Sequence, residues 1–189
     1  LLLALCSFSL AITTLQAQTV SLKSQPVRIT VPRGVASNVV ATVTITMAGT
    51  FTTGVNFAVT GVPAGCTSTL STNTISVAGT HTATLNFSSP TTLAQGDYDL
   101  AIEATGEASY RLPVPVNCSY VWSGSAGTAW STPANWLGGV LPGESDGVVF
   151  GNLGGTTSNP TPTNLVVSAD TTVSSIRFAQ DQSNGTKAY

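Results

Sequence analysis

Glu144 and Asp146 are the carboxylates nearest in sequence to the tryptophans of this 189-residue chain. A pair of carboxylates beside aromatic rings is an arrangement that can hydrolyse glycosides. Here the two lie two residues apart in the sequence PGESDG, which favours turn formation instead. No Gly-x-Ser-x-Gly elbow, His-Glu-x-x-His motif, P-loop or dinucleotide fingerprint occurs in the chain. We therefore predict a protein that is not an enzyme, with no catalytic residue and no cofactor.

A second group of acidic residues, Asp97, Asp99 and Glu103, shares one face of an expected strand. Alternating carboxylates could supply oxygen ligands to calcium. The alternative, which we favour, is a solvated face whose charges protect a strand from aggregation. His81 is the only histidine and follows a Gly-Thr pair, so we interpret it as a loop residue. We predict no metal site.

Residues 1–17 are predicted to be a signal peptide. The run LLLALCSFSLA is apolar but too short to span a membrane, and Ala17 is a small residue at the expected cut. A lipid anchor on Cys6 is the alternative, which the bulky Leu5 before it disfavours. No methionine or basic segment precedes Leu1, so we expect the natural chain to begin earlier. The protein is expected to be exported, with no membrane span in this part.

Export permits disulfides, and Cys66 and Cys118 form an even pair beyond the predicted leader. We predict a bridge between them, which would add about 4 kcal/mol of stability in the chain-entropy model. Two buried free thiols are the alternative.

The composition is unusually poor in charge. Charged residues make up 7% of the chain and the net charge is −2, while hydrophobic residues make up 42%. No basic stripe is present to bind nucleic acid or an anionic membrane surface. Threonine and valine are abundant and strong helix formers are scarce, so the chain is predicted to be all-β.

Residues 18–119 are predicted to form one β-sandwich. Val39, Ala41, Val43, Ile45 and Met47 alternate with polar residues, which is the period of a half-buried strand. Similar short runs follow, the last from Tyr110 to Val116, and turn residues separate them. The segments GVPAG and LAQGDYDLAIEA make this part similar to bacterial immunoglobulin-like repeats. That resemblance implies an immunoglobulin-like domain acting as an extracellular spacer or binding module.

Residues 120–189 contain all the tryptophans: Trp122, Trp130 and Trp136. Two glycines separate Trp122 from Trp130, a spacing that predicts a hairpin with neighbouring indoles. Aromatic rings must supply most of the packing in so glycine-rich a segment. Beyond it, short apolar pieces such as Leu165 to Val167 need stacked neighbours to bury one face.

The segments VWSGSAGTAWSTPANW, LPGESDGVVF and TTVSSIRF resemble the opening of bacterial proteins with autotransporter-associated β-strand repeats. The match runs from Val121 to Phe178 and includes the three tryptophans, Asn135, Pro142, Asp146 and Phe150. It implies the start of a right-handed parallel β-solenoid displayed on the bacterial surface. Residues 120–189 would then be its tryptophan-rich beginning, and we expect the repeat region to continue beyond Tyr189.

Two functions follow as hypotheses. The favoured one is a non-catalytic structural or adhesive cell-surface protein of autotransporter-passenger type, with the three indoles buried. The alternative is a carbohydrate-binding accessory module, in which Trp122, Trp130 and Trp136 face solvent and stack on sugar rings. A surface glycan or a protein ligand is the expected kind of partner, and the sequence does not identify it. Burial of the indoles distinguishes the two.

Overall fold

The computed structural model describes residues 17–151 and 165–179. The predicted signal peptide therefore lies outside the described residues, apart from Ala17. The described chain is built from strands and one short 3-10 helix, and none of its helices is long and apolar enough to cross a membrane. The strands are β1 (Thr19–Gln25), β2 (Ile29–Pro32), β3 (Ser37–Ala48), β4 (Val55–Thr60), β5 (Thr67–Leu70), β6 (Thr74–Ile75), β7 (Gly79–Ser89), β8 (Gly96–Tyr98), β9 (Ala101–Gly106), β10 (Tyr110–Pro113), β11 (Val116–Val121), β12 (Gly147–Gly151) and β13 (Ser175–Ala179).

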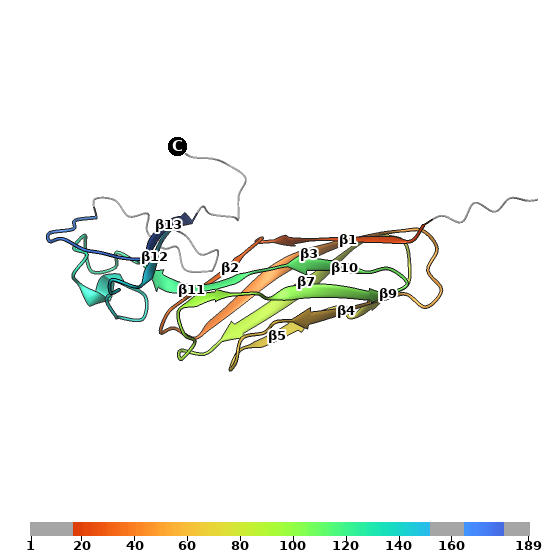
Figure 1. The fold of residues 1–189 in the computed structure, drawn as a ribbon, viewed down its shortest axis with the longest axis horizontal. Coiled ribbons are helices and arrows are strands. Elements are labelled where there is room, and N and C mark those ends of the chain that lie inside the picture. Colours follow the sequence, from red (N-terminus) through yellow and green to blue (C-terminus); the bar gives the residue numbers. More distant parts are fainter. Residues whose placement is uncertain (1–16, 152–164, 180–189) are drawn as a thin grey trace, which may run out of the picture.

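Two antiparallel sheets form a β-sandwich (Figure 1). The first has the order β1-β3-β7-β5 and the second the order β10-β9-β4-β6. The long strands β3 and β7 pair from Ser37 opposite Ser89 to Met47 opposite Gly79. The predictions of an all-β chain and a two-sheet sandwich are confirmed.

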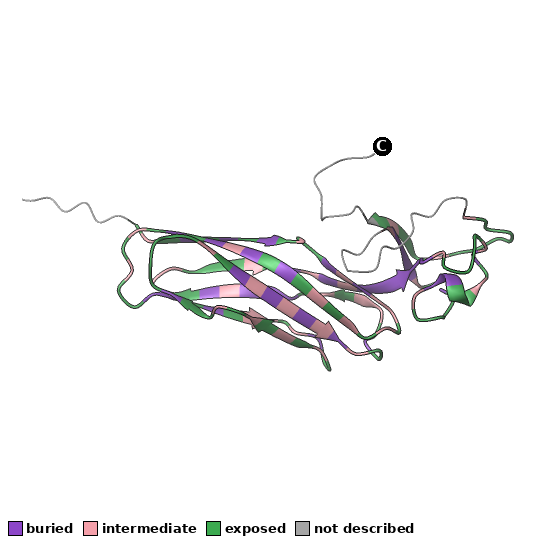
Figure 2. Ribbon diagram, turned by 180° about the vertical axis from the view of Figure 1, so that it is seen from behind, coloured by how far each residue is buried: buried purple, intermediate pink, exposed green. Residues whose placement is uncertain are grey.

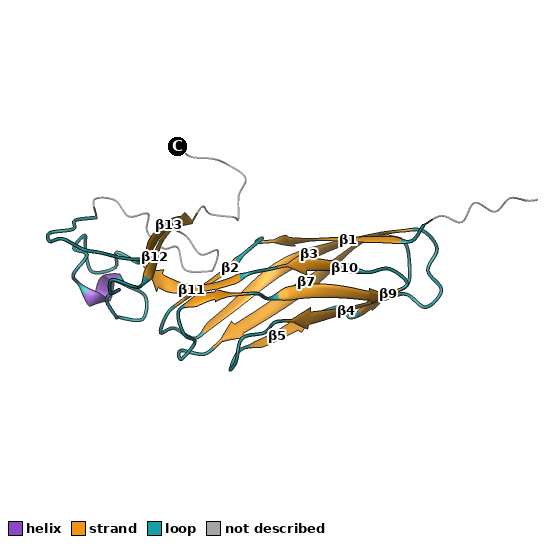
Figure 3. Ribbon diagram, in the orientation of Figure 1, coloured by secondary structure: helices purple, strands orange, loops and turns teal. Residues whose placement is uncertain are grey.

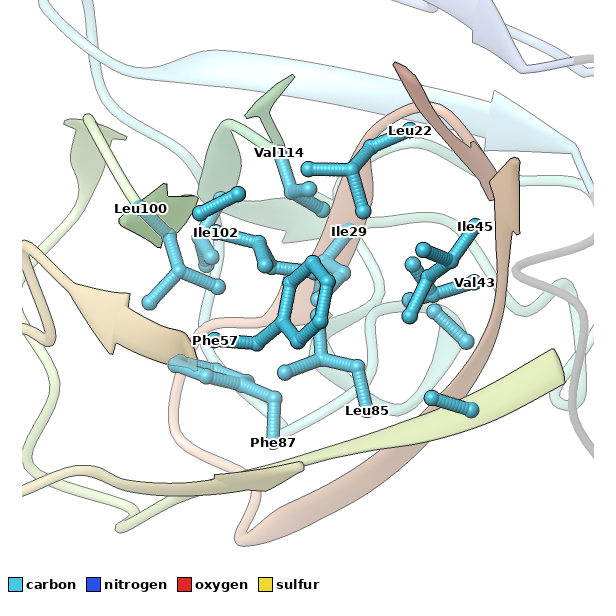
Figure 4. Close-up of a cluster of buried hydrophobic side chains, with 14 of the residues drawn as sticks. Leu22, Ile29, Val43, Ile45, Phe57, Leu85, Phe87, Leu100, Ile102 and Val114 are labelled. Atoms are coloured by element: carbon cyan, nitrogen blue, oxygen red, sulfur yellow. The ribbon is translucent and has the colours of Figure 1, made fainter. Parts of the chain in front are cut away.

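The sandwich core comes directly from the period-two pattern. Figure 2 shows buried and exposed bands alternating along the strands. Val43 and Ile45 on β3 are fully buried, and their side chains approach Leu85 and Phe57 between the sheets (Figure 4). Burying each such side chain contributes roughly 1.5–3 kcal/mol. Polar neighbours such as Thr42 stay on the outer face.

One strand, β11, continues out of the sandwich. Its first residues pair in parallel with β2, from Val116 opposite Ile29, and antiparallel with β8. Its last residues, Tyr120 and Val121, pair in parallel with β12, which in turn pairs in parallel with β13. Figure 3 shows β12, β13 and the 3-10 helix together in a smaller part of the molecule, next to the end of β11. We call β11, β12 and β13 the parallel ladder.

The run from Tyr110 onward differs in one respect from the sequence prediction. It forms two strands rather than one, because the chain leaves the second sheet at Val114 and Pro115. The Val114 amide donates to Leu100 O (2.8 Å), and Pro115 has no amide hydrogen with which to continue a ladder. This break redirects β11 toward β2 and, farther on, toward β12.

Candidate functional site

The three indoles, on which the functional hypotheses depend, lie in one small core. Trp122 and Trp136 are each 2% exposed and Trp130 is 8% exposed. The ring of Trp136 meets Trp122 edge-on at 5.2 Å between centroids and Trp130 edge-on at 4.7 Å. Phe150 of β12 lies 6.1–6.2 Å from all three rings. We call this the tryptophan cluster, which also includes Tyr120 and Val148.

Asn135, at the end of the 3-10 helix Pro133–Asn135, organises the backbone around the indoles. Its side chain is fully buried; Nδ2 donates to Ala129 O (2.9 Å), and Oδ1 accepts from the Ala126 amide (2.7 Å). The Trp136 indole Nε1 donates to Trp130 O (3.0 Å). These side-chain hydrogen bonds hold the glycine-rich loop between Trp122 and Trp136, which has no regular sheet pairing of its own.

The predicted hairpin between Trp122 and Trp130 is wrong. Trp122 instead forms an isolated antiparallel bridge with Trp136. The reason is the turn at Asn135, whose carbonyl oxygen accepts from the Ser123 amide at 2.7 Å and so returns the chain toward β11. The Trp130 amide bonds farther along the chain, to Val166 O at 3.0 Å.

The burial of the indoles bears on the carbohydrate alternative. Stacking on a sugar requires an aromatic face that is open to solvent. The three rings are instead packed against one another and against Phe150. The requirement of exposed indoles at Trp122, Trp130 and Trp136 is therefore not met in this structure.

Glu144 and Asp146 lie in the turn before β12. The Asp146 carboxylate accepts from the Gly143 amide (2.7 Å), and the Asp146 amide donates to Gly143 O (3.0 Å). Glu144 is exposed. This arrangement closes a turn, and the Asp146 carboxylate is engaged with the Gly143 amide rather than with the aromatic rings.

The parallel ladder has a constant period. Tyr120, Val148 and Ile176 occupy one level of the three strands, 28 residues apart in each step. Phe178 continues the level of Phe150, and the two rings stack at 5.7 Å. On β13, Ile176 is 56% exposed and Phe178 is 78% exposed. Among the described residues, β13 pairs only with β12, so its outer edge is unpaired there.

A polar network ties β13 back to the sandwich, and sequence analysis does not identify it. Arg177 Nη2 donates to Thr30 Oγ1 (2.6 Å) and to Asn117 Oδ1 (3.0 Å). Asn117 Nδ2 donates to Asp97 Oδ1 (2.9 Å), which also pairs with Arg28 (2.9 Å). Burial lowers the pKa of Arg177, as does the nearby Arg28, while Asp97 opposes this change. The network joins four strands: β2, β8, β11 and β13.

Two of the three acidic residues considered for calcium, Asp97 and Glu103, make separate contacts. Asp97 belongs to the network just described, whereas Glu103 accepts from Thr60 Oγ1 (3.1 Å) and pairs with Arg111 (3.5 Å). In the described parts of the chain, no three His, Cys, Asp or Glu side chains gather as a metal site requires. His81 bonds to Val77 O at 2.9 Å.

Both cysteines of the sandwich are free thiols in this structure, so the predicted bridge is not formed there. Cys118 is 1% exposed and Cys66 is partly buried, and both pack against the sandwich core. Burial raises the pKa of each thiol. The reduced state corresponds to the alternative of two free thiols, although Cys66 is only partly covered.

No family model and no curated protein matches the chain. The resemblance of residues 121–178 to autotransporter-associated repeats thus stays a prediction. A crystal structure of S-layer protein SbsC domains 4 and 5 is 21% identical, over 52% of this chain and 50% of that one, with a TM-score of 0.37. S-layer protein rSbsC(31-844) is also 21% identical, over 53% of this chain and 14% of that one, with the same TM-score of 0.37.

A family 123 glycoside hydrolase from Clostridium perfringens is 10% identical, over 62% of this chain and 29% of that one, with a TM-score of 0.39. The chain therefore spans half or less of the length of these three proteins. At such TM-scores we draw no functional conclusion from them.

Proposed function

We propose that this protein is a non-catalytic structural protein of the bacterial cell surface, in which a β-sandwich begins and caps a parallel β-solenoid. The observation that carries the proposal is the constant 28-residue step between Tyr120, Val148 and Ile176 in parallel register. A solenoid is built from such steps, each contacting its neighbours. The first strand of the ladder, β11, also packs Val116 and Cys118 into the core of the sandwich.

A cap is needed at the first step because a parallel strand with no neighbour leaves amides and carbonyls unpaired. Here β2 and β8 pair with the first half of β11, and β12 pairs with the second half. The three indoles of the tryptophan cluster pack against Tyr120 of β11 and against Val148 and Phe150 of β12, at the first two strands of the ladder. The indoles thereby serve folding, which supports a structural function over sugar binding.

The surface location rests on the sequence. Residues 1–17 have the pattern of a signal peptide. Charged residues are few, so the solubility of the chain depends on threonine, serine, asparagine and glycine. The resemblance to autotransporter-associated repeats adds an adhesive function of passenger type. Within residues 17–151 and 165–179 the outer edge of β13 has no partner strand, and this edge, beside the exposed Ile176 and Phe178, is where the next step of a solenoid would pair.

Tryptophan fluorescence tests the proposal, because all three indoles lie in one cluster. The chain is quenched with acrylamide and titrated with a panel of polysaccharides, with N-acetyltryptophanamide and the guanidinium-unfolded chain as exposed references. We expect weak quenching in the folded chain and no change with any polysaccharide. Strong quenching that a particular polysaccharide suppresses would replace the structural function with a carbohydrate-binding one.

A further inference from the structure

Gln18 lies directly before β1, and its side chain reaches two distant parts of the sandwich. Its Nε2 donates to Glu107 Oε2 (2.7 Å) and to Thr50 O. Thr50 follows β3 of the first sheet, whereas Glu107 follows β9 of the second sheet. The carboxamide of one residue therefore ties the beginning of β1 to both sheets.

The Glu107 carboxylate is held in place independently of Gln18. Its other oxygen, Oε1, accepts from the Thr52 amide (2.9 Å) and from the hydroxyls of Thr52 (2.8 Å) and Thr53 (2.7 Å). Such bonds, with the Thr53 amide contributing most, lower the pKa of Glu107 to about 2. The carboxylate is therefore an anion at neutral pH and remains an acceptor for Gln18.

The backbone next to Gln18 is fixed as well. Thr19 lies opposite Ala48 in the antiparallel pairing of β1 with β3, and this pairing continues as far as Gln25. Gln18 is the residue immediately before this strand, and it is partly buried. Both its backbone and its carboxamide are therefore held by the folded sandwich.

Gln18 is also the residue that the predicted cut after Ala17 would leave at the N-terminus. A glutamine there has a free α-amine, which is a nucleophile and can attack its own side-chain carbon Cδ. The bond from the α-nitrogen to Cδ forms, the bond from Cδ to Nε2 breaks, and Nε2 leaves as ammonia with a proton from the amine. The product is pyroglutamate. Before the cut the α-nitrogen belongs to a peptide bond, so the reaction becomes possible only after it.

The contacts of the carboxamide oppose this ring closure. Cyclisation needs Cδ placed against the α-nitrogen of the same residue, and it expels Nε2. In the folded chain Nε2 is the donor of both hydrogen bonds, to Glu107 and to Thr50 O. Reacting groups that are held in another geometry react more slowly, because the favourable orientation must first be reached. Both bonds have to break before Gln18 can cyclise.

We propose that Gln18 is the N-terminal residue of the mature protein, and that Glu107 preserves its carboxamide against cyclisation. Glu107 is a positioning residue in this respect, because it holds Nε2 away from the reaction. Cyclisation would remove Nε2 and with it both hydrogen bonds, so the retained glutamine keeps the beginning of β1 tied to the two sheets. This inference goes beyond the proposed function and does not depend on the parallel ladder.

The test uses the full chain, with an initiator methionine added before Leu1, exported by a bacterium. Peptide mass spectrometry of the purified protein identifies its first residue. We expect an N-terminal peptide that begins at Gln18 and has not lost ammonia. The purified protein is then incubated at mildly alkaline pH, both folded and unfolded in guanidinium. Cyclisation should be about tenfold slower in the folded protein, because two hydrogen bonds oppose it there.

Variants separate the effect of Glu107 from that of folding in general. Glu107→Ala should cyclise several times faster than the wild-type protein while its far-UV circular dichroism stays unchanged. Glu107→Gln, which keeps an acceptor oxygen, should lie between the two. Glu103→Ala is the matched control, because this carboxylate bonds to Thr60 and Arg111 instead and should leave the rate unchanged.

Four results would overturn the proposal. They are a first residue other than Gln18, equal cyclisation rates in the folded and unfolded wild-type protein, a folded Glu107→Ala that cyclises no faster than the wild type, and a loss of ammonia that links Gln18 to a Thr52 or Thr53 hydroxyl. Peptide mapping distinguishes the last product from pyroglutamate. The comparison of folded with unfolded wild-type protein needs no variant to fold. The tryptophan measurements are independent of all these results, so this proposal and the proposed function can fail separately.

Discussion

Phe178 stacks on Phe150 at one level of the parallel ladder, with ring centroids 5.7 Å apart and planes inclined by 27°. The two rings differ sharply in their surroundings. Phe150 is 3% exposed and has indoles on its inner side, whereas Phe178 is 78% exposed. The stacked pair is therefore covered by other side chains on the side of the tryptophan cluster and exposed to solvent on the side of β13.

This asymmetry predicts unequal effects of the same truncation. Phe150→Ala removes a ring that contacts three indoles and should lower the free energy of unfolding of the cluster by about 3–5 kcal/mol. Phe178→Ala removes a mostly solvated ring and should change it by about 0.5 kcal/mol or less. Guanidinium titrations followed by tryptophan fluorescence measure the cluster, since all three tryptophans lie in it.

Far-UV circular dichroism provides the control, because most strands belong to the sandwich. Its transition should shift less than the fluorescence transition in Phe150→Ala. An equal loss in the free energy of unfolding for Phe150→Ala and Phe178→Ala would contradict the difference in burial between the two rings.

Asn135 offers a second test of how the cluster is built. Asn135→Ala deletes the bonds to the Ala126 amide and to Ala129 O, and it leaves a cavity in a fully buried position. Losing these bonds should destabilise the cluster by about 1–3 kcal/mol. The measurement is the fluorescence-detected denaturation midpoint, with near-UV circular dichroism to report looser indole packing.

The matched control is Asn56→Ala. Asn56 is exposed and its side chain accepts one hydrogen bond, from Thr74 Oγ1 at 2.8 Å. It should change stability by about 0.5 kcal/mol or less. An Asn135 variant no less stable than this control would mean that the loop around the indoles holds its shape without the amide.

The strands of the sandwich can be predicted because a sheet buries one face, so the alternation along β3 reports burial directly. The indoles form a cluster, as the scarcity of other large side chains in residues 120–150 suggests. Their pairing is not predictable from spacing, because the seven residues between Trp122 and Trp130 fit a hairpin as well as a loop. The turn at Asn135 brings Trp136, and not Trp130, opposite Trp122 in the backbone bridge.

No local sequence pattern indicates the hydrogen bonds of Arg177. Its partners Thr30 and Asn117 lie 147 and 60 residues earlier in the chain. A single arginine on a short strand has many polar partners compatible with its sequence. Only the parallel pairing of β13 with β12, next to β11, selects these two.

Arg177 is predicted to fix the position of β13. Arg177→Gln removes hydrogen bonds made by a charged donor, each worth about 1.5–3 kcal/mol. Amide hydrogen exchange in β13 should therefore accelerate tenfold or more, while the sandwich strands β3 and β7 keep their protection. Arg111→Gln is the control, because its contact with Glu103 is an exposed pair at 3.5 Å on another strand. Unchanged exchange in β13 would show that backbone pairing alone holds this strand.

The last prediction concerns Glu107, whose carboxylate fixes the loop between β3 and β4. It accepts from the Thr52 amide (2.9 Å), from the hydroxyls of Thr52 (2.8 Å) and Thr53 (2.7 Å), and from Gln18 Nε2 (2.7 Å). It also accepts from the amides of Thr53 and Gly54. The Thr53 amide contributes most to lowering the pKa of Glu107, from 4.5 to about 2. The carboxylate is thus favoured as an anion by the folded loop.

The pKa of Glu107 is lower in the folded chain than in the unfolded chain. The hydrogen bonds of its carboxylate therefore stabilise the fold fully above pH 4.5, and this stabilisation is lost as the pH falls toward 2. The melting temperature of the wild-type chain should exceed that of Glu107→Gln at pH 7, and the difference should shrink steadily between about pH 5 and pH 2. Glu144→Gln, which alters an exposed turn residue, should follow the wild-type profile. A difference that is independent of pH would assign the stabilisation to the shape of the side chain rather than to its charge.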